Sequence, residues 1–193
     1  MGPVTGVLAL QGAFAAHGAA LIRCGAEVRE VRTPADLAAV DALVLPGGES
    51  TTICKLLVQS GLRGPLETRL SAGLPVLGTC AGLIILSAEV VDGRPDQFCF
   101  GAIDVSSRRN GFGRQRDSFE ADLPVPGGEG SVRAVFIRAP RIVRCGGAVE
   151  VMASLDGEPV LVRQGTALGA TFHPELSGDD RIHRLFLGFL TEV

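Results

Sequence analysis

The clearest chemical signal in the chain is the motif Gly78-Thr79-Cys80-Ala81-Gly82, which separates an apolar run from an apolar helical pattern. This Gly-x-Cys-x-Gly motif is the cysteine counterpart of the serine nucleophile elbow, in which small residues allow a tight strand-to-helix turn. Such a turn exposes its central side chain, and a helix N-terminus stabilises a thiolate there. Cys80 is therefore a candidate nucleophile. The alternative is a buried structural cysteine between two incidental glycines.

A nucleophilic cysteine needs a base, and His173 is the best candidate among the three histidines. It begins the sequence His173-Pro174-Glu175 after an apolar run, and residues i and i+2 of an extended segment point the same way. Glu175 is therefore expected to orient the imidazole and leave its other nitrogen for Cys80. His17 and His183 fall in helical patterns and are expected on helix surfaces, although His17 also follows a strand end that borders a site.

The segment 46–51 (PGGEST) follows a short apolar run and forms the third chemical element. In open α/β sheets, ligands bind at the carboxyl ends of the strands. Gly47 and Gly48 allow backbone N–H groups to face a developing negative charge, as an oxyanion hole requires. A phosphate-binding loop is the competing interpretation, but the pattern G-x-x-x-x-G-K-[ST] is absent.

The first half of the chain alternates apolar runs with helical patterns, which predicts parallel strands connected by helices. Thr33 and Pro34 are typical of a helix start. The expected strands are 4–10, 27–32, 42–45 and 75–79. The expected helices are 13–24, 35–40, one that is capped by Ser50 or Thr51 and ends at about 60, 65–72 and 81–88.

The second half is richer in strand patterns and turns. Strands are expected at 102–107, 132–138, 149–155, 159–163 and 168–172, with an exposed loop at 127–130 and a helix from about 179 to 190. These strands are expected to extend the same sheet in antiparallel fashion. The fold class is therefore α/β, a three-layer doubly wound mixed sheet, and the absence of repeats or long linkers predicts a single domain over 1–193.

Composition excludes several classes of protein. The net charge of −3 provides no field for nucleic acid or anionic membrane, and the chain has no Trp or Tyr for base stacking. Five cysteines without a CxxC pair or a Cys/His cluster make a disulfide framework or a metal site unexpected. No signal peptide or membrane-length apolar run is found, so we expect a cytoplasmic protein without nucleic-acid or membrane partners.

Taken together, these motifs resemble the class I (triad) glutamine amidotransferases and, within them, the glutaminase subunits of pyridoxal 5′-phosphate synthase. The stretches that carry the resemblance span nearly the whole chain in order: GVLALQGA (6–13), LVLPGGESTT (43–52), LGTCAGLIIL (77–86), RNGFGRQRDSFE (109–120), VFIRAP (135–140) and FHPEL (172–176). Two departures are Gly111, where a Ser is expected, and Ala16, where an acidic residue is common.

The resemblance implies a flavodoxin-like fold and a role for each matched residue. By position, Cys80, His173 and Glu175 form the triad, and Gln11 lies in a partner-sensitive loop. The residues implied in glutamine binding are Gly48, Glu49, Ser50, Arg109, Ile137 and Arg138, and those implied in the oxyanion hole are Gly48 and Ala81. Without the resemblance, the cluster of Arg108, Arg109, Arg114 and Arg116 would be interpreted as a solvated face.

The resemblance further implies hydrolysis of L-glutamine to L-glutamate and ammonia, without a cofactor or metal in this chain. The implied partner is a (β/α)8-barrel synthase subunit that uses the ammonia to make pyridoxal 5′-phosphate. Two alternatives stay open. One is a peptidase- or esterase-like cysteine hydrolase on the same fold, and the other is a non-catalytic subunit that binds glutamine or a partner.

Overall fold

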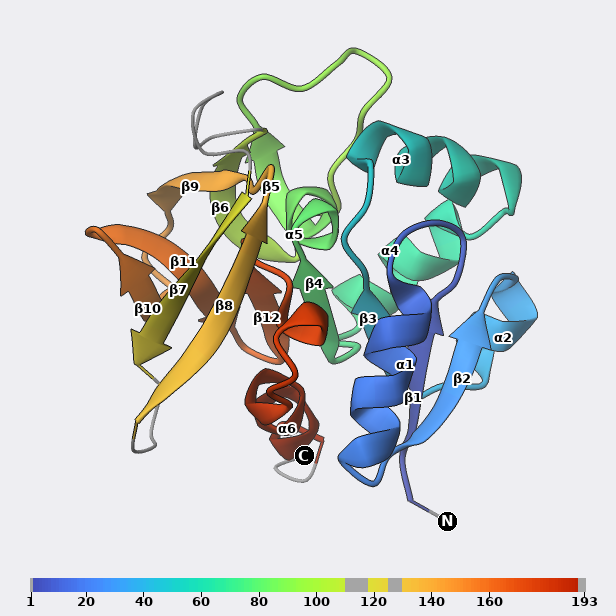
Figure 1. Ribbon diagram of the computed structural model, residues 1–193. Helices are drawn as coiled ribbons and strands as arrows, with labels where there is room; N and C mark the ends of the chain where they lie inside the picture. The colour runs from blue at the N-terminus through green and yellow to red at the C-terminus, as the bar shows by residue number, and fades with distance from the viewer. Residues whose placement is uncertain (1, 110–117, 125–129, 191–193) are drawn as a thin grey trace.

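The computed structural model describes residues 2–109, 118–124 and 130–190 (Figure 1). Gly111, Arg114, Arg116 and most of the predicted loop at 127–130 lie outside these ranges. Within the described ranges, no helix is both long enough and apolar enough to cross a membrane.

The first half of the chain alternates strands and helices, as predicted. Only the element ends differ, mostly by one to a few residues. The elements are β1 (Val4–Leu8), α1 (Phe14–Arg23), β2 (Glu27–Val31), α2 (Pro34–Ala38), β3 (Ala42–Leu45), α3 (Ser50–Gln59), α4 (Arg63–Ser71), β4 (Val76–Thr79) and α5 (Ala81–Leu86).

The second half contains the predicted strands and three more that the sequence did not reveal, namely β5, β7 and β9. Its elements are β5 (Ser87–Val90), β6 (Ile103–Arg108), β7 (Ser118–Pro124), β8 (Ser131–Ile137), β9 (Arg141–Cys145), β10 (Glu150–Leu155), β11 (Glu158–Gln164), β12 (Ala167–Ala170), the 3-10 turn η1 (Pro174–Leu176) and α6 (Arg181–Gly188).

The described strands form a seven-stranded sheet in the order β10-β11-β12-β4-β3-β1-β2. The strands from β12 to β2 pair in parallel, whereas β10, β11 and β12 pair antiparallel across short turns. The prediction of an antiparallel extension was wrong for β6 and β8. Strand β6 lies between β5 and β9 in a second sheet, and β8 pairs with β7 along its whole length as a two-stranded ribbon.

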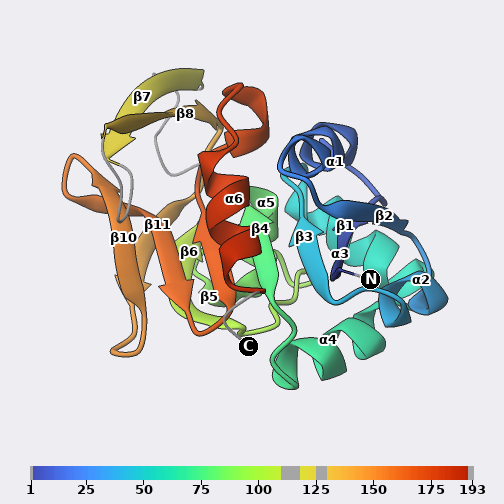
Figure 2. The same cartoon turned by 90° about the horizontal axis from the view of Figure 1, so that it is seen from below.

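Two apolar cores lie on opposite faces of the large sheet. One face packs against α1, α6 and the β7-β8 ribbon, through residues such as Leu21, Phe136 and Phe186. The other packs against the helices α2 to α5 and the β5-β6-β9 sheet, through residues such as Leu57 and Ile103. Figure 2 shows α1 and α6 on one side of the sheet and α4 on the other. Both faces of the parallel strands are therefore covered, which explains why these strands are apolar throughout.

Two helix starts show how local sequence sets the elements. Thr33 caps α2 in a capping box with Asp36, as the Thr-Pro pair predicted. The cap of α3 is Glu49 rather than Ser50 or Thr51, because its carboxylate accepts from the backbone N–H groups of Thr51 and Thr52. Glu49 thereby satisfies two N–H groups that a helix start leaves unpaired.

Candidate active site

The sheet order brings the three chemical segments to one edge. Strand β4 lies between β12 and β3, and all three run in parallel with Thr79 beside Ala170 and Gly78 beside Leu45. The segments that follow these strands carry Cys80, His173 and the loop 46–51. Because the carboxyl ends of parallel strands meet at one edge of the sheet, three distant parts of the chain converge there, as predicted.

Cys80 occupies a strained turn between β4 and α5. Its backbone has φ 48° and ψ −103°, and its N–H donates to the Ala170 carbonyl at 2.8 Å. A Cβ atom at Gly78 would lie 2.7 Å from the carbonyl carbon of Gly82, so the turn requires a small residue there. The nucleophile-elbow geometry predicted for residues 78–82 is therefore present. A left-handed non-glycine residue costs roughly 1–3 kcal/mol, and such strain gathers at functional sites.

His173 lies between Cys80 and Glu175. Its Nδ1 atom is 2.8 Å from Glu175 Oε1, which leaves Nε2 as the nitrogen that bonds to the Cys80 sulfur. Both side chains are buried, that of Glu175 completely. The loop after β3 also packs on this imidazole, because a Cβ atom at Gly47 would lie 2.4 Å from His173 Cε1.

The surroundings of His173 and Glu175 favour a protonated imidazole beside an ionised carboxylate. Burial on its own would lower the pKa of His173, but hydrogen bonds with Cys80 and Glu175 outweigh burial and raise it to about 10. Burial would likewise raise the pKa of Glu175, yet the hydrogen bond with His173 and the nearby imidazoles keep that pKa below its usual value. At neutral pH, His173 is therefore an imidazolium beside the sulfur, and Glu175 is a carboxylate.

Cys80 and His173 open onto a pocket of about 280 Å³. Its lining residues include nine of the site residues expected from the sequence, together with Ile84, which was missed although it lies one helical turn after Cys80. They are Gln11, Gly48, Glu49, Ser50, Cys80, Ile84, Arg109, Ile137, Arg138 and His173. The two remaining expected residues do not line it, since Glu175 lies behind His173 and Ala81 is buried at the start of α5.

Gln11 holds the loop that follows β3. Its Oε1 atom accepts the N–H of Glu49 at 3.0 Å. A Cβ atom at Gly48 would lie 2.4 Å from the same oxygen. The loop after β1 therefore supports the loop that carries the expected oxyanion donor, and position 48 requires glycine for this contact.

The lining of the pocket includes two arginines and one carboxylate. Arg109 Nη2 lies 3.5 Å from Glu49 Oε1, and Arg138 is an exposed residue with φ 43°. Partial burial opposes ionisation of Glu49, but hydrogen bonds from Thr51 and Thr52 lower its pKa to about 2. The pocket thus offers both charge signs to a small zwitterion.

The expectation that His17 and His183 lie on helix surfaces was wrong. Both are completely buried, on α1 and α6, where these helices pack on one another and on the sheet. His17 Nε2 lies 3.2 Å from Glu175 Oε2, and His17 Nδ1 lies 2.9 Å from His183 Nε2. Helical spacing contained the signal, because His17 shares one face with Ala20 and Leu21, which are also buried.

The other four cysteines are far less suited to nucleophilic chemistry. Burial raises the pKa of Cys24, Cys54, Cys99 and Cys145, for Cys99 to about 11. In the part of the chain that the structure describes, no group of three or more His, Cys, Asp or Glu side chains is arranged to hold a metal ion.

Two relatives of known name match nearly the whole chain. A relative from Mycobacteroides abscessus, named pyridoxal 5′-phosphate synthase subunit PdxT, is 57% identical over 187 residues and 97% of each chain. One of the same name from Streptomyces coelicolor is 56% identical over 185 residues, covering 95% of this chain and 92% of the relative.

Solved structures agree in fold. A crystal structure of a glutamine amidotransferase superposes with a TM-score of 0.91 at 50% identity, covering 97% of this chain and 98% of the other. The structure of PurLQS from Thermotoga maritima shares the fold at 17% identity with a TM-score of 0.69, covering 100% of this chain and 99% of the other. The model of the SNO glutamine amidotransferase family matches residues 7–192, and the chain therefore belongs to that family.

Proposed function

We propose that this chain hydrolyses L-glutamine to L-glutamate and ammonia and delivers the ammonia to a pyridoxal 5′-phosphate synthase subunit. The observation that carries the proposal is the His173 imidazole, which bonds Cys80 with one nitrogen and Glu175 with the other at the wall of a pocket. Nucleophile, base and orienting carboxylate are thus in the order that acyl-transfer chemistry requires.

The pocket suits glutamine in size and in charge. Arg109 and Arg138 are the groups to bind the α-carboxylate, and Glu49 is the group to bind the α-ammonium. Ser50 and Ile137 also line the pocket. Ile84 gives an apolar contact for the side-chain methylenes. An Arg–carboxylate contact at this end would hold the side-chain amide against Cys80.

The proposed reaction uses His173 first as an acid and then as a base. The Cys80 thiolate attacks the side-chain amide carbon, and the imidazolium of His173 donates its proton to the leaving nitrogen as ammonia departs. The resulting glutamyl thioester is attacked by water, whose proton passes to His173, and glutamate leaves as the thiolate reforms. Glu175 stays ionised throughout and stabilises each imidazolium.

The negative oxygen of both tetrahedral intermediates requires hydrogen-bond donors. The backbone N–H groups of Gly48 and Ala81 are the proposed pair. Ala81 N–H is at the first residue of α5, where helical N–H groups have no intrahelical acceptor. Gly48 faces the same pocket as Cys80, and preorganised donors of this kind stabilise a developing oxyanion.

The proposed partner is a (β/α)8-barrel synthase subunit. The relatives of this chain carry the name of a synthase subunit, which supports an assembly of unlike chains. Ammonia that escaped into water at neutral pH would become ammonium, which is not a nucleophile. A protected route from Cys80 to the synthase subunit is therefore part of the proposal.

The test is glutamate release by the purified chain, with and without its synthase subunit, compared with Cys80→Ala. We expect hydrolysis by the unaltered chain in the complex, none by the variant, and equal binding of both to the synthase subunit. Retained hydrolysis by Cys80→Ala would refute the proposal.

The same preparation separates the alternatives. A glutamine-analogue electrophile should trap one equivalent of thioester on Cys80, which a purely regulatory subunit would not form. Cleavage of esters or peptides without release of ammonia from glutamine would instead favour a general cysteine hydrolase.

A further inference from the structure

The carboxylate of Glu175 lies between two imidazoles. Its Oε1 atom is 2.8 Å from His173 Nδ1, and its Oε2 atom is 3.2 Å from His17 Nε2. The side chains of His17 and Glu175 are both 0% exposed, so water does not compete for these contacts. His17 is therefore the polar group that faces the second oxygen of the carboxylate.

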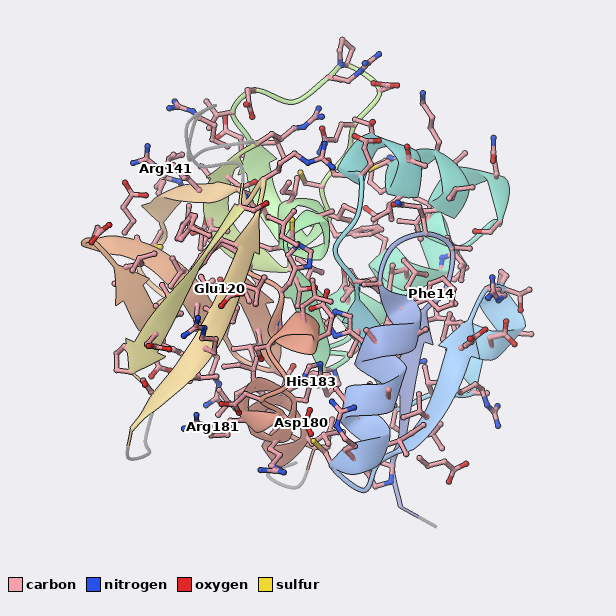
Figure 3. The ribbon with its side chains drawn as sticks, viewed as in Figure 1. Phe14, Glu120, Arg141, Asp180, Arg181 and His183 are labelled. Atoms are coloured by element: carbon pink, nitrogen blue, oxygen red, sulfur yellow. The ribbon has the colours of Figure 1, made fainter. Side chains whose placement is uncertain are left out.

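His17 is itself held by two further residues. Its Nε2 atom lies 3.1 Å from Oγ1 of Thr79, the residue that precedes Cys80 in the sequence. Its Nδ1 atom lies 2.9 Å from His183 Nε2. Figure 3 labels His183 on α6, between that helix and α1. A buried polar chain thus runs from the C-terminal helix through α1 to the back of Glu175.

Both additional histidines are neutral at physiological pH. Burial, reinforced by the neighbouring imidazoles and only partly opposed by Glu175, lowers the pKa of His17 to about 4. Burial also lowers the pKa of His183, despite opposition from Glu175 and Asp180. Asp180 is itself paired with Arg23 at 2.7 Å, so the negative charge that Asp180 presents to His183 is largely balanced.

The contacts assign the proton on each ring. With its proton on Nε2, His17 donates to Thr79 Oγ1, and its Nδ1 accepts from the Nε2–H of His183. The same Nε2–H lies 3.2 Å from Glu175 Oε2, which accepts no hydrogen bond among the described residues, so this contact is electrostatic. The opposite arrangement would direct a lone pair at the carboxylate. It would also place an N–H on His183 Nδ1, which has no hydrogen-bond partner among the described residues. A buried unpaired donor of that kind costs about 1–3 kcal/mol.

We propose that His17 and His183 are positioning residues: the neutral imidazole of His17, oriented by His183, fixes the rotamer of Glu175 and thereby aims His173 at Cys80. This inference rests on the proposed glutaminase function. A neutral N–H beside the second carboxylate oxygen attracts that oxygen without cancelling its charge, so the full negative charge remains available to the imidazolium of His173. A charged group in the place of His17 would compete with His173 for the same carboxylate.

The first experiment compares His17→Phe with His17→Gln in the complex with the synthase subunit. Phe keeps the ring volume and removes the donor, whereas Gln places an amide N–H near the position of Nε2. We expect His17→Phe to lower kcat for glutamine hydrolysis by roughly 10- to 100-fold with little change in KM, since small misplacements of catalytic groups have effects of this size. His17→Gln should retain most of the kcat that His17→Phe loses.

The second variant is His183→Phe. It should lower kcat less than His17→Phe does, because His183 acts through His17. Phe186→Leu is the packing control on the same helix, since this buried side chain contributes only apolar contacts near the pair. The control should lower Tm and leave kcat unchanged. An equal loss of kcat in Phe186→Leu would assign the effect to packing and overturn the proposal.

A double-mutant cycle shows whether His17 acts through Glu175. In a Glu175→Gln background, His17→Phe should cause almost no further loss of kcat. Full additivity of the two losses would contradict the proposal, because residues that act as one unit are strongly non-additive.

A final pair of measurements needs no glutamine turnover. Nitrogen-15 NMR of histidine-labelled protein should show both His17 and His183 as neutral Nε2–H tautomers at pH 7, and a charged or Nδ1–H form of His17 would overturn the proposal. The pH profile for alkylation of Cys80 by iodoacetamide should shift in His17→Phe and return in His17→Gln. Absent glutaminase activity in the unaltered complex would refute the proposed function, whereas an unshifted alkylation profile alone would refute only the positioning role.

Discussion

Gly82 packs on Leu45 so closely that a Cβ atom at position 82 would lie 2.0 Å from the Leu45 carbonyl oxygen. The contact joins the first turn of α5 to the end of β3, so the turn that carries Cys80 lies directly on the neighbouring strand. No side-chain movement relieves such a clash, because the obstructing atom belongs to the backbone. The glycine spacing of the motif therefore reflects the packing of a helix on a sheet.

Gly82→Ala should destabilise the protein and reduce the activity of Cys80. Overpacking of a tight interior typically costs about 1–3 kcal/mol, and a backbone obstacle places this substitution at the upper end. Urea denaturation and glutamate release measure the two effects.

The matched control is Gly18→Ala in α1, where the nearest atom to a new Cβ is a Val28 methyl carbon at 3.8 Å. Alanine in a helix interior without a clash should stabilise the protein by about 0.4–1 kcal/mol. If both substitutions had the same effect, the close approach at Gly82 would not explain the motif.

Glu175→Gln should remove the charge behind His173 with little change in volume. In a serine protease triad the corresponding change lowers kcat by about 10⁴-fold, and we expect a loss of roughly 10²- to 10⁴-fold here with KM nearly unchanged. Steady-state glutamate release in the complex checks this. A kcat close to that of the unaltered protein would show that Glu175 does not orient the base.

The raised pKa of His173 predicts how stability depends on pH. The native imidazolium titrates near pH 10 instead of the ordinary 6.5. A raised native pKa means that the stabilising contribution is fully present below pH 6.5 and disappears as pH rises through about 10. Between these limits the native state binds a proton that the unfolded state has released, so stability falls with increasing pH.

His173→Gln removes this titration and provides the comparison. The difference in free energy of unfolding between the unaltered protein and the variant should shrink from pH 6.5 to pH 10, as urea denaturation at several pH values would show. A constant difference would contradict the raised pKa. An NMR titration of the imidazole gives the value directly, and Cys80→Ala should lower it because the contact with the sulfur is lost.

Arg109→Ala should weaken glutamine binding far more than the chemical step. A hydrogen bond to a charged group contributes about 1.5–3 kcal/mol, which corresponds to roughly a 10- to 100-fold rise in KM. Initial rates over a range of glutamine concentrations separate KM from kcat. Arg109→Lys keeps the charge but not the bidentate geometry, so its KM should lie between those of the unaltered protein and Arg109→Ala. An unchanged KM in Arg109→Ala would remove Arg109 from the binding site.

The sequence was most informative where local chemistry sets the structure. The motif around Cys80 and the Thr33 cap depend on neighbouring residues, and their geometry appears as expected. The contact between His173 and Glu175 is also present, but Pro174–Leu176 forms a 3-10 turn instead of the extended segment from which the contact was predicted. The parallel order of the strands followed from the alternation of apolar runs and helices. Both kinds of prediction use a physical rule that acts within one unit of structure.

Long-range packing accounts for what the sequence did not reveal. Pairing between separate segments forms the ribbon of β7 and β8 and the sheet of β5, β6 and β9. The pattern of apolar residues in a strand does not indicate which other strand it pairs with. His17 and His183 lie 166 positions apart, and nothing local to either residue indicates that α1 and α6 bury them against one another. Glu49 was missed as a cap because Ser and Thr are the preferred residues at that position and two of them, Ser50 and Thr51, follow it directly.

The hydrogen bond from Cys80 to Ala170 continues the ladder between β4 and β12, the strands that lead to the sulfur and to the imidazole. The spacing of these two groups is therefore a property of the innermost ladder, not of flexible connections. Fraying at the periphery leaves that spacing untouched, so inactivation by denaturant should coincide with global unfolding. The surface loops of such an enzyme can therefore change in sequence and bind other proteins without altering the spacing of the Cys80 sulfur and the His173 imidazole.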